Sequence, residues 1–209
     1  MKSERPAATQ GTAKPVRADA QRNAERVLAA ARRAVASAGL DVSYHEIARE
    51  AGVGVGTVYR RYPERDQLMA AVLSDILAEL IDTARRALDC DDTWEGFSLL
   101  FTDLALRTTQ NAGLSGSLDQ YGGPAVAEQR HELLGLARRV IERAQDQGRL
   151  RRDLAWQDVL RLTGAPATQG CVLGLEPGLT RGHRSVLAVL LDGLQTGPHR
   201  RRAETLRSG

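Results

Sequence analysis

The chain has 209 residues, enough for one compact domain or two small ones with a buried core. Hydrophobic residues make up 42% of it, which excludes a disordered chain, and its longest apolar run, residues 186–191, is far too short to span a membrane. Cys90 and Cys171 form neither a disulfide framework nor a metal-binding spacing, and no signal peptide is visible. We therefore expect a reduced, cytoplasmic protein with no membrane partner.

Charge is spread unevenly, although lysine and arginine total 29 against 26 for aspartate and glutamate. Residues 1–16 carry a net charge of +2 and residues 17–65 one of +3, whereas residues 66–198 hold thirteen cations and eighteen anions. Residues 199–209 are basic again. A basic front that precedes an acidic body indicates that the front meets a polyanion.

The front of the chain predicts three helices after a polar segment. Residues 1–16, with two prolines and small polar side chains, predict a flexible basic tail. A helical period of apolar residues begins near Asp19. Ser43 has the capping-box spacing to Glu46, in which each side chain bonds the other residue's backbone N–H, so a second helix is expected there. A third helix is expected over residues 55–62.

The rest of the chain predicts further helices of very different length. Pro63 is expected in the first turn of a long fourth helix that continues to about Leu88, and Asp92 or Thr93 is expected to cap the next one. Later helical patterns cover residues 94–108, 124–148, 156–171 (interrupted at Gly164 and Pro166) and 181–195. No segment alternates convincingly with a period of two residues, so we expect an all-α fold of about nine helices.

Residues 43–62, SYHEIAREAGVGVGTVYRRY, have the layout of a helix-turn-helix. Two short helices are joined by a tight turn at Gly52, and the second helix of this motif lies in the major groove of DNA. Its outward residues include hydroxyl and guanidinium groups, which suit contacts to phosphates and base edges.

The longer run IAREAGVGVGTVYRRYPERDQL resembles the DNA-binding signature of the TetR family of bacterial transcriptional repressors, with a specific match over residues 17–68. The resemblance implies a helix-turn-helix DNA-binding domain at residues 17–65 and a helical ligand-binding and dimerisation domain at 66–198, followed by a basic tail at 199–209. It also implies that Ser43 caps the second helix and touches a phosphate, and that Arg65 clamps the DNA backbone.

By the same resemblance, the recognition helix supplies Thr57, Tyr59 and Arg61 for groove or phosphate contacts. Gly54 replaces the usual serine cap, which predicts a less firm start to that helix. The candidate DNA-binding residues are Ser43, His45, Val55, Gly56, Thr57, Tyr59, Arg60, Arg61 and Arg65. Two alternatives stay open: the arginines could form an ordinary solvated face, and the Tyr59 ring could belong to the core.

The resemblance also implies that the acidic body binds a ligand and a second copy of the chain. Aromatic residues cluster near residues 94–101, which predicts an apolar pocket, although an aromatic stripe also fits an ordinary core. The pocket candidates are Trp94, Phe97, Phe101, Leu104, Arg107, Thr108, Leu118, Tyr121, Leu136, Val140 and Cys171. The candidates for a homodimer interface, with ordinary core as the alternative, are Val186, Leu187, Leu190, Leu191 and Leu194.

No catalytic constellation or phosphate loop stands out, so we expect neither an enzyme nor a cofactor. Glu128, His131 and Glu132 share one helical pattern, but no companion ligands stand at metal-binding spacing, and no metal site is expected. The sequence thus predicts a homodimeric repressor that binds a palindromic operator in double-stranded DNA and is released by a small-molecule effector of unknown identity. The alternative is an architectural or ligand-sequestering helical protein that uses the helix-turn-helix without specific regulation.

Overall fold

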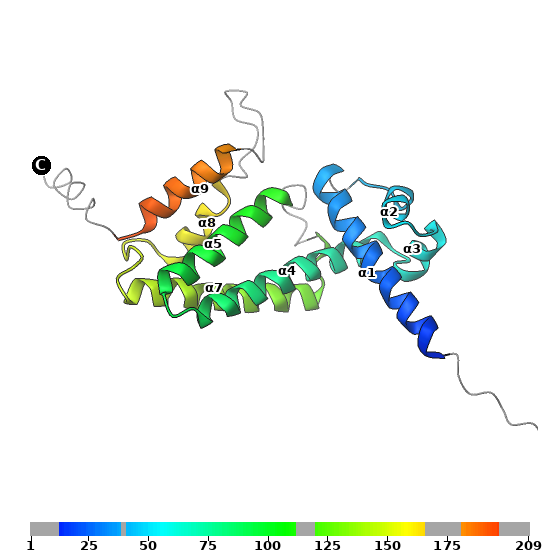
Figure 1. Ribbon diagram of the computed structural model, residues 1–209, viewed down its shortest axis with the longest axis horizontal. Helices are drawn as coiled ribbons and strands as arrows, with labels where there is room; N and C mark the ends of the chain where they lie inside the picture. The colour runs from blue at the N-terminus through cyan, green and yellow to red at the C-terminus, as the bar shows by residue number, and fades with distance from the viewer. Residues whose placement is uncertain (1–12, 39–40, 112–119, 166–180, 197–209) are drawn as a thin grey trace, which may run out of the picture. The chain divides into compact units, whose positions relative to one another are not determined.

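The structure, a computed structural model, describes residues 13–38, 41–111, 120–165 and 181–196, and these form helices. The helices are α1 (Ala13–Ala38), α2 (Tyr44–Ala51), α3 (Val55–Arg61), α4 (Arg65–Asp89), α5 (Thr93–Gln110), α7 (Pro124–Asp146), α8 (Trp156–Leu162) and α9 (Arg181–Leu194) (Figure 1). Within the described residues the one β-type pairing is an isolated bridge between Leu150 and Gln195. The prediction of an all-α fold is confirmed, and the residues that the structure describes contain eight helices where about nine were expected for the chain.

The chain divides into two units, residues 1–68 and residues 69–209. The expected boundary between the DNA-binding domain and the body, after Arg65, lies close to this division. The division falls inside the first turns of α4, which starts at Arg65.

Two helix starts differ from the sequence expectation. Helix α1 already begins at Ala13, so residues 13–16 of the expected tail are helical. Pro15 is compatible with this start because the first turn of a helix has backbone N–H groups without intrahelical partners. Helix α4 begins at Arg65, so Pro63 lies before the helix rather than in its first turn. Tyr62 ends α3 with φ −130° and ψ 81°, in keeping with the restriction that a proline places on the preceding residue.

The first unit holds α2 and α3 against the second half of α1. The side chains of Val27 and Val35 from α1, Ile47 from α2 and Val58 from α3 are fully buried. Because Val27 and Val35 are eight residues apart, they lie on one face of α1. Polar contacts also join α1 to α2, since Arg33 Nε donates to Glu50 Oε1 at 2.6 Å.

The second unit is built around α4, α5 and α7, which run alongside one another (Figure 1). Phe97, Phe101 and Ile141 are almost completely buried in its core. Asp92 caps α5 by accepting hydrogen bonds from the backbone N–H groups of Trp94 and Glu95 at 2.7 and 3.3 Å. This confirms the cap expected at residues 92–93.

The ends of several helices are fastened by side chains. Arg143 of α7 donates to the carbonyls of Leu88 and Cys90 at 2.5 and 2.9 Å, and so satisfies the last turn of α4. A backbone contact holds the end of α9, where the backbone N–H of Arg151 donates to Leu194 O at 3.0 Å.

In the described residues no helix has the length and apolar character needed to cross a membrane.

Helix α8 ends at Leu162, earlier than the pattern over residues 156–171 predicted. The backbone continues as a turn through Thr163 and Gly164, and Gly164 is one of the two residues at which the sequence predicted an interruption. Residues 166–180 lie outside the described part of the chain.

Candidate functional site

The turn between α2 and α3 depends on glycine because of its backbone conformation. Gly52 has φ +64°, a left-handed conformation that residues other than glycine rarely adopt. The flexible end of the Arg26 side chain lies beside it, and Arg26 Nη2 donates to Gly52 O at 3.2 Å. The N–H of Val53 then bonds Ala48 O at 3.0 Å, which closes the turn. These contacts set the direction in which α3 leaves α2.

Ser43 and Glu46 form the predicted capping box at the start of α2. The Glu46 N–H donates to Ser43 Oγ at 3.2 Å, and the Ser43 N–H donates to Glu46 Oε2 at 2.8 Å. The backbone N–H of Ser43, followed by its hydroxyl, lowers the pKa of Glu46 below its usual value. Ser43 and the neighbouring His45 are both exposed, so both candidates lie at the surface at the N-terminal end of α2.

Helix α3 turns Val58 into the core and leaves most of its other side chains accessible. Gly56, Tyr59, Arg60 and Arg61 are exposed. Val55 and Thr57 are half-buried on the same short helix. Gly54 is the N-cap residue and supplies no side-chain hydrogen bond, in line with the less firm start that the sequence predicted.

Tyr59 is neither fully core nor fully free. Its side chain is 50% exposed, while its ring packs on Tyr44 with the ring centroids 4.7 Å apart. Tyr44 is itself buried and its hydroxyl donates to Tyr62 O at 2.9 Å. Burial raises the pKa of the Tyr44 phenol, so this hydroxyl keeps its proton and remains a donor. Tyr44 thus supports the Tyr59 ring from below and leaves its outer edge accessible.

The two arginines at the ends of this surface differ in their contacts. The Arg61 guanidinium lies over the Tyr62 ring, 5.4 Å from its centroid, and stays exposed. Arg65 is half-buried, and its Nη1 donates to Val42 O at 2.8 Å, while its Nη2 is buried without a hydrogen-bond partner. In this structure Arg65 therefore joins the start of α4 to the segment before α2, a structural contact that the sequence reasoning had not anticipated.

The aromatic pocket expected in the body is closed in the structure. Phe97 and Phe101 pack 5.5 Å apart, and with Leu104 they border a cavity of only about 10 Å³. That volume is about the space of one water molecule, too small for an organic ligand. The remaining lining residues of this cavity are Leu100, Ile141, Val159 and Leu160.

The other pocket candidates do not converge on this cavity. Trp94 packs on Phe97 at 5.4 Å but stays partly exposed. Val140 is buried, Leu136 and Tyr121 are half-buried, and the Thr108 hydroxyl donates to Leu104 O at 2.8 Å. Arg107 instead lines two open hollows beside α4. Leu118 and Cys171 lie outside the described residues.

The dimer candidates on α9 divide by exposure. Leu194 is buried within the chain itself, with 2% of its surface exposed, whereas Val186 is 43% exposed. Leu187, Leu190 and Leu191 are half-buried. Val189 was missed by the sequence reasoning and is 70% exposed, although its place in the apolar run 186–191 was a usable signal.

The possible metal ligands on α7 are not assembled into a site. Glu132 pairs with Arg85 at 2.7 Å, and His131 is exposed. No group of three or more possible ligands from His, Cys, Asp and Glu occurs in the part of the chain that the structure describes.

The geometry defines a class of protein: an exposed recognition helix held by a tight glycine turn, in a chain whose second unit is a helical body. The family profile described as "Bacterial regulatory proteins, tetR family" matches residues 27–72. The crystal structure of a TetR transcription regulatory protein from Mycobacterium vanbaalenii is 31% identical, with a TM-score of 0.64, over 87% of this chain and 100% of that one. The chain belongs to the TetR family of bacterial regulatory proteins.

Two further relatives agree with this assignment. The structure of a TetR transcriptional regulator from Streptomyces coelicolor is 27% identical and has a TM-score of 0.64, covering 82% of this chain and 97% of that one. An uncharacterised HTH-type transcriptional regulator from Mycobacterium tuberculosis is 43% identical over 68 residues. That match covers 32% of this chain and 35% of the relative's length. The protein is thus a transcriptional regulator with a helix-turn-helix DNA-binding domain, and not an enzyme.

Proposed function

We propose that the protein is a homodimeric repressor that binds a palindromic operator in double-stranded DNA and leaves it when a small molecule binds the second unit. The observation that carries the DNA-binding part is the outer face of α3. There Tyr59, Arg60 and Arg61 are exposed while Val58 is fully buried and fixes the helix in its unit. Guanidinium and hydroxyl groups on one accessible helix suit phosphate and base-edge contacts.

The two-fold part of the proposal rests on α9. Two copies joined through its exposed apolar side chains would present two recognition helices, and a palindrome with half-sites about 34 Å apart matches such symmetry. The response to an effector follows from linkage, because a molecule that binds better to the DNA-free form lowers the affinity for DNA by the same factor.

The first experiment is a fluorescence anisotropy titration of the full chain. The probe is duplex DNA from upstream of the protein's own gene, and the comparison is a shuffled duplex of equal length and composition, at two or more salt concentrations. We expect tighter binding to the upstream duplex. Equal affinities for the two duplexes would contradict specific regulation and favour the architectural alternative.

The second experiment asks which arginine meets the phosphates. Arg61→Ala should weaken binding to both duplexes and reduce the slope of log K against log salt by about 1, because one phosphate contact is lost. Arg138→Ala is the matched control, since Arg138 is an exposed arginine on α7 paired with Glu142 at 2.7 Å. An unchanged slope for Arg61→Ala would remove Arg61 from the interface.

A further inference from the structure

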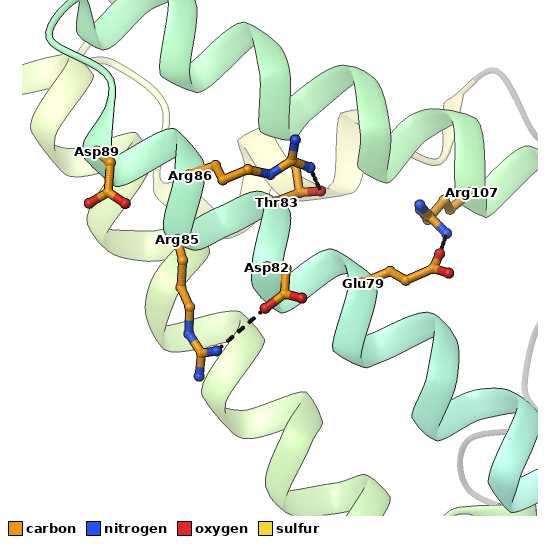
Figure 2. A pocket seen from close by; sticks show the side chains of 7 residues that line it. All are labelled: Glu79, Asp82, Thr83, Arg85, Arg86, Asp89 and Arg107. Atoms are coloured by element: carbon orange, nitrogen blue, oxygen red, sulfur yellow. Dashed lines mark hydrogen bonds and ion pairs between the residues drawn. The ribbon is translucent and has the colours of Figure 1, made fainter. Parts of the chain in front are cut away.

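The outer side of the α4–α5 pair is hollowed in two places. One hollow of about 590 Å³ is lined from both helices, and a second of about 510 Å³ lies mainly along α4. The two hollows share Thr83, Arg86 and Arg107, so Arg86 borders both of them. Figure 2 shows the residues that line the smaller hollow. Both hollows are open to solvent, and their volumes fall within the roughly 300–1,000 Å³ of binding sites for small organic molecules. We call the larger hollow the α4–α5 groove.

The floor of the α4–α5 groove is a hydrogen-bonded chain of polar groups. Thr83 is 2% exposed, and its hydroxyl donates to Asp103 Oδ2 at 2.8 Å while it accepts from Arg86 Nη2 at 2.9 Å. Arg107 donates to Asp103 Oδ1 at 3.0 Å and also pairs with Glu79. Arg107 thus pairs with both carboxylates of this hydrogen-bonded network, those of Asp103 and Glu79.

Arg86 is not paired with either of these two carboxylates. Among the described residues no carboxylate lies within ion-pair distance of its guanidinium, which donates only to the Thr83 hydroxyl. The neighbouring Arg85 points away from α5 and pairs with Asp82 at 3.4 Å (Figure 2). Arg85 also pairs with Glu132 of α7 at 2.7 Å. The remaining donors of Arg86 are therefore available to an anion in the α4–α5 groove.

The α5 wall of the groove carries two exposed leucines among polar side chains. Leu99 and Leu106 are 37% and 42% exposed, and both line the hollow. They stand two helical turns apart on one face, a separation of about 10 Å along the axis, with Thr102 between them. Beside them the Ser98 hydroxyl is buried without a hydrogen-bond partner. Glu95 also lines the groove, and its carboxylate would repel an anionic head placed beside it.

We propose that the α4–α5 groove binds a small amphipathic anion, a carboxylate whose head meets Arg86 and whose apolar chain lies along Leu99 and Leu106. One part of this inference rests on the proposed function: that the bound ligand is the effector that changes the affinity for DNA. Binding itself needs no DNA, and it places the effector in an open groove rather than in the closed aromatic cavity.

The test is isothermal titration calorimetry of the full chain with octanoate, compared with octylammonium and with acetate. Octanoate should bind saturably at millimolar or lower concentration, and the other two should not, because one has the wrong charge and the other no apolar chain. Arg86→Gln should weaken octanoate binding about tenfold or more, the usual effect of losing a charged hydrogen bond. Leu106→Ser should weaken it several-fold.

Two matched variants control for general effects. Arg85→Gln removes the adjacent arginine, and Leu134→Ser removes an equally exposed leucine on α7 that does not line the groove; both should bind octanoate as the parent does. If Arg86→Gln fails to fold, Arg86→Lys keeps the charge and should stay within a few-fold of the parent. Absence of saturable octanoate binding, equal binding of octylammonium, or equal loss in Arg85→Gln would overturn the proposal.

A DNA arm separates this inference from the proposed function. Octanoate should weaken binding to the upstream duplex in the parent and not in Arg86→Gln. If octanoate binds but the protein does not distinguish upstream from shuffled DNA, the groove stands and the repressor proposal fails. If the protein is sequence-specific but octanoate does not bind, the groove proposal fails alone.

Discussion

At the scale of single residues, Gly54 is the weak point of the recognition helix. Its φ of −68° and ψ of 142° suit any residue, and no atom lies within 4 Å of the Cβ that a side chain would add. Gly54→Ser should therefore add the missing cap bond and also restrict the unfolded chain. We expect a gain of about 0.5–1 kcal/mol in the opening free energy of α3, measured by amide hydrogen exchange.

The control for this change is Gly54→Ala, which restricts the unfolded chain but cannot accept a hydrogen bond at the cap. It should stabilise α3 less than serine does. A gain from alanine as large as that from serine would show that the cap bond contributes nothing.

The Ser43–Glu46 capping box predicts a pH dependence in the same unit. The pKa of Glu46 is lowered in the folded chain, chiefly by the Ser43 backbone N–H. The stability that comes from this carboxylate is therefore present above its usual pKa of about 4.5 and is lost as the pH falls through the lower folded-state value. Amide exchange at α2 should show this loss on acidification, and Glu46→Gln should abolish the step. The same step in Glu46→Gln would assign the titration to another group.

At the scale of helices, the approach of α4 to α5 depends on Gly96. A Cβ at this position would stand 2.3 Å from the carbonyl oxygen of Ala87, a backbone atom that cannot move without shifting α4. Gly96→Ala should thus destabilise the chain by about 2 kcal/mol, measured by urea unfolding, despite the better helix propensity of alanine.

The matched control has the opposite expected sign. Gly135 lies in the middle of α7 with open space around its Cβ position. Gly135→Ala should stabilise the protein by about 0.5–1 kcal/mol through helix propensity alone. If both substitutions shifted the urea midpoint in the same direction, the close approach at Gly96 would not limit the packing of α4 on α5.

The helices also show which features a sequence can predict. The Ser43–Glu46 box, the Asp92 cap and the turn at Gly52 rest on hydrogen bonds between residues a few positions apart, so spacing alone revealed them. The prediction of a pocket depended on which side of α5 faces α7, and this long-range packing cannot be derived from spacing. In the structure Phe97 and Phe101 are buried in the core. Arg86 was missed because a polar stripe on a long helix is indistinguishable in sequence from an ordinary solvated face.

At the scale of the whole molecule, the charge division acquires a physical consequence. Residues 17–65 carry +3 and residues 66–198 carry −5, so DNA is attracted by the first of these two segments and repelled by the second. Non-specific binding through the body is therefore disfavoured, and contact is directed to the unit that carries α3. Added salt should weaken both the attraction and the repulsion, because ions screen charges beyond a Debye length of about 8–10 Å.

The exposed apolar side chains of α9 predict how two copies of the chain assemble. Val186 and Val189 are 43% and 70% exposed, and a second copy of the chain packed on α9 would remove this apolar surface from water. In a two-fold interface each side chain occurs twice, so Val189→Glu would bury two unpaired charges. We expect the dimer dissociation constant to rise about 100-fold or more, measured by sedimentation velocity. The monomer should then bind a full palindrome no better than a half-site. Leu134→Glu, at an exposed leucine of α7, should remain dimeric. If Leu134→Glu dissociated the dimer and Val189→Glu did not, the interface would lie on α7 and not on α9.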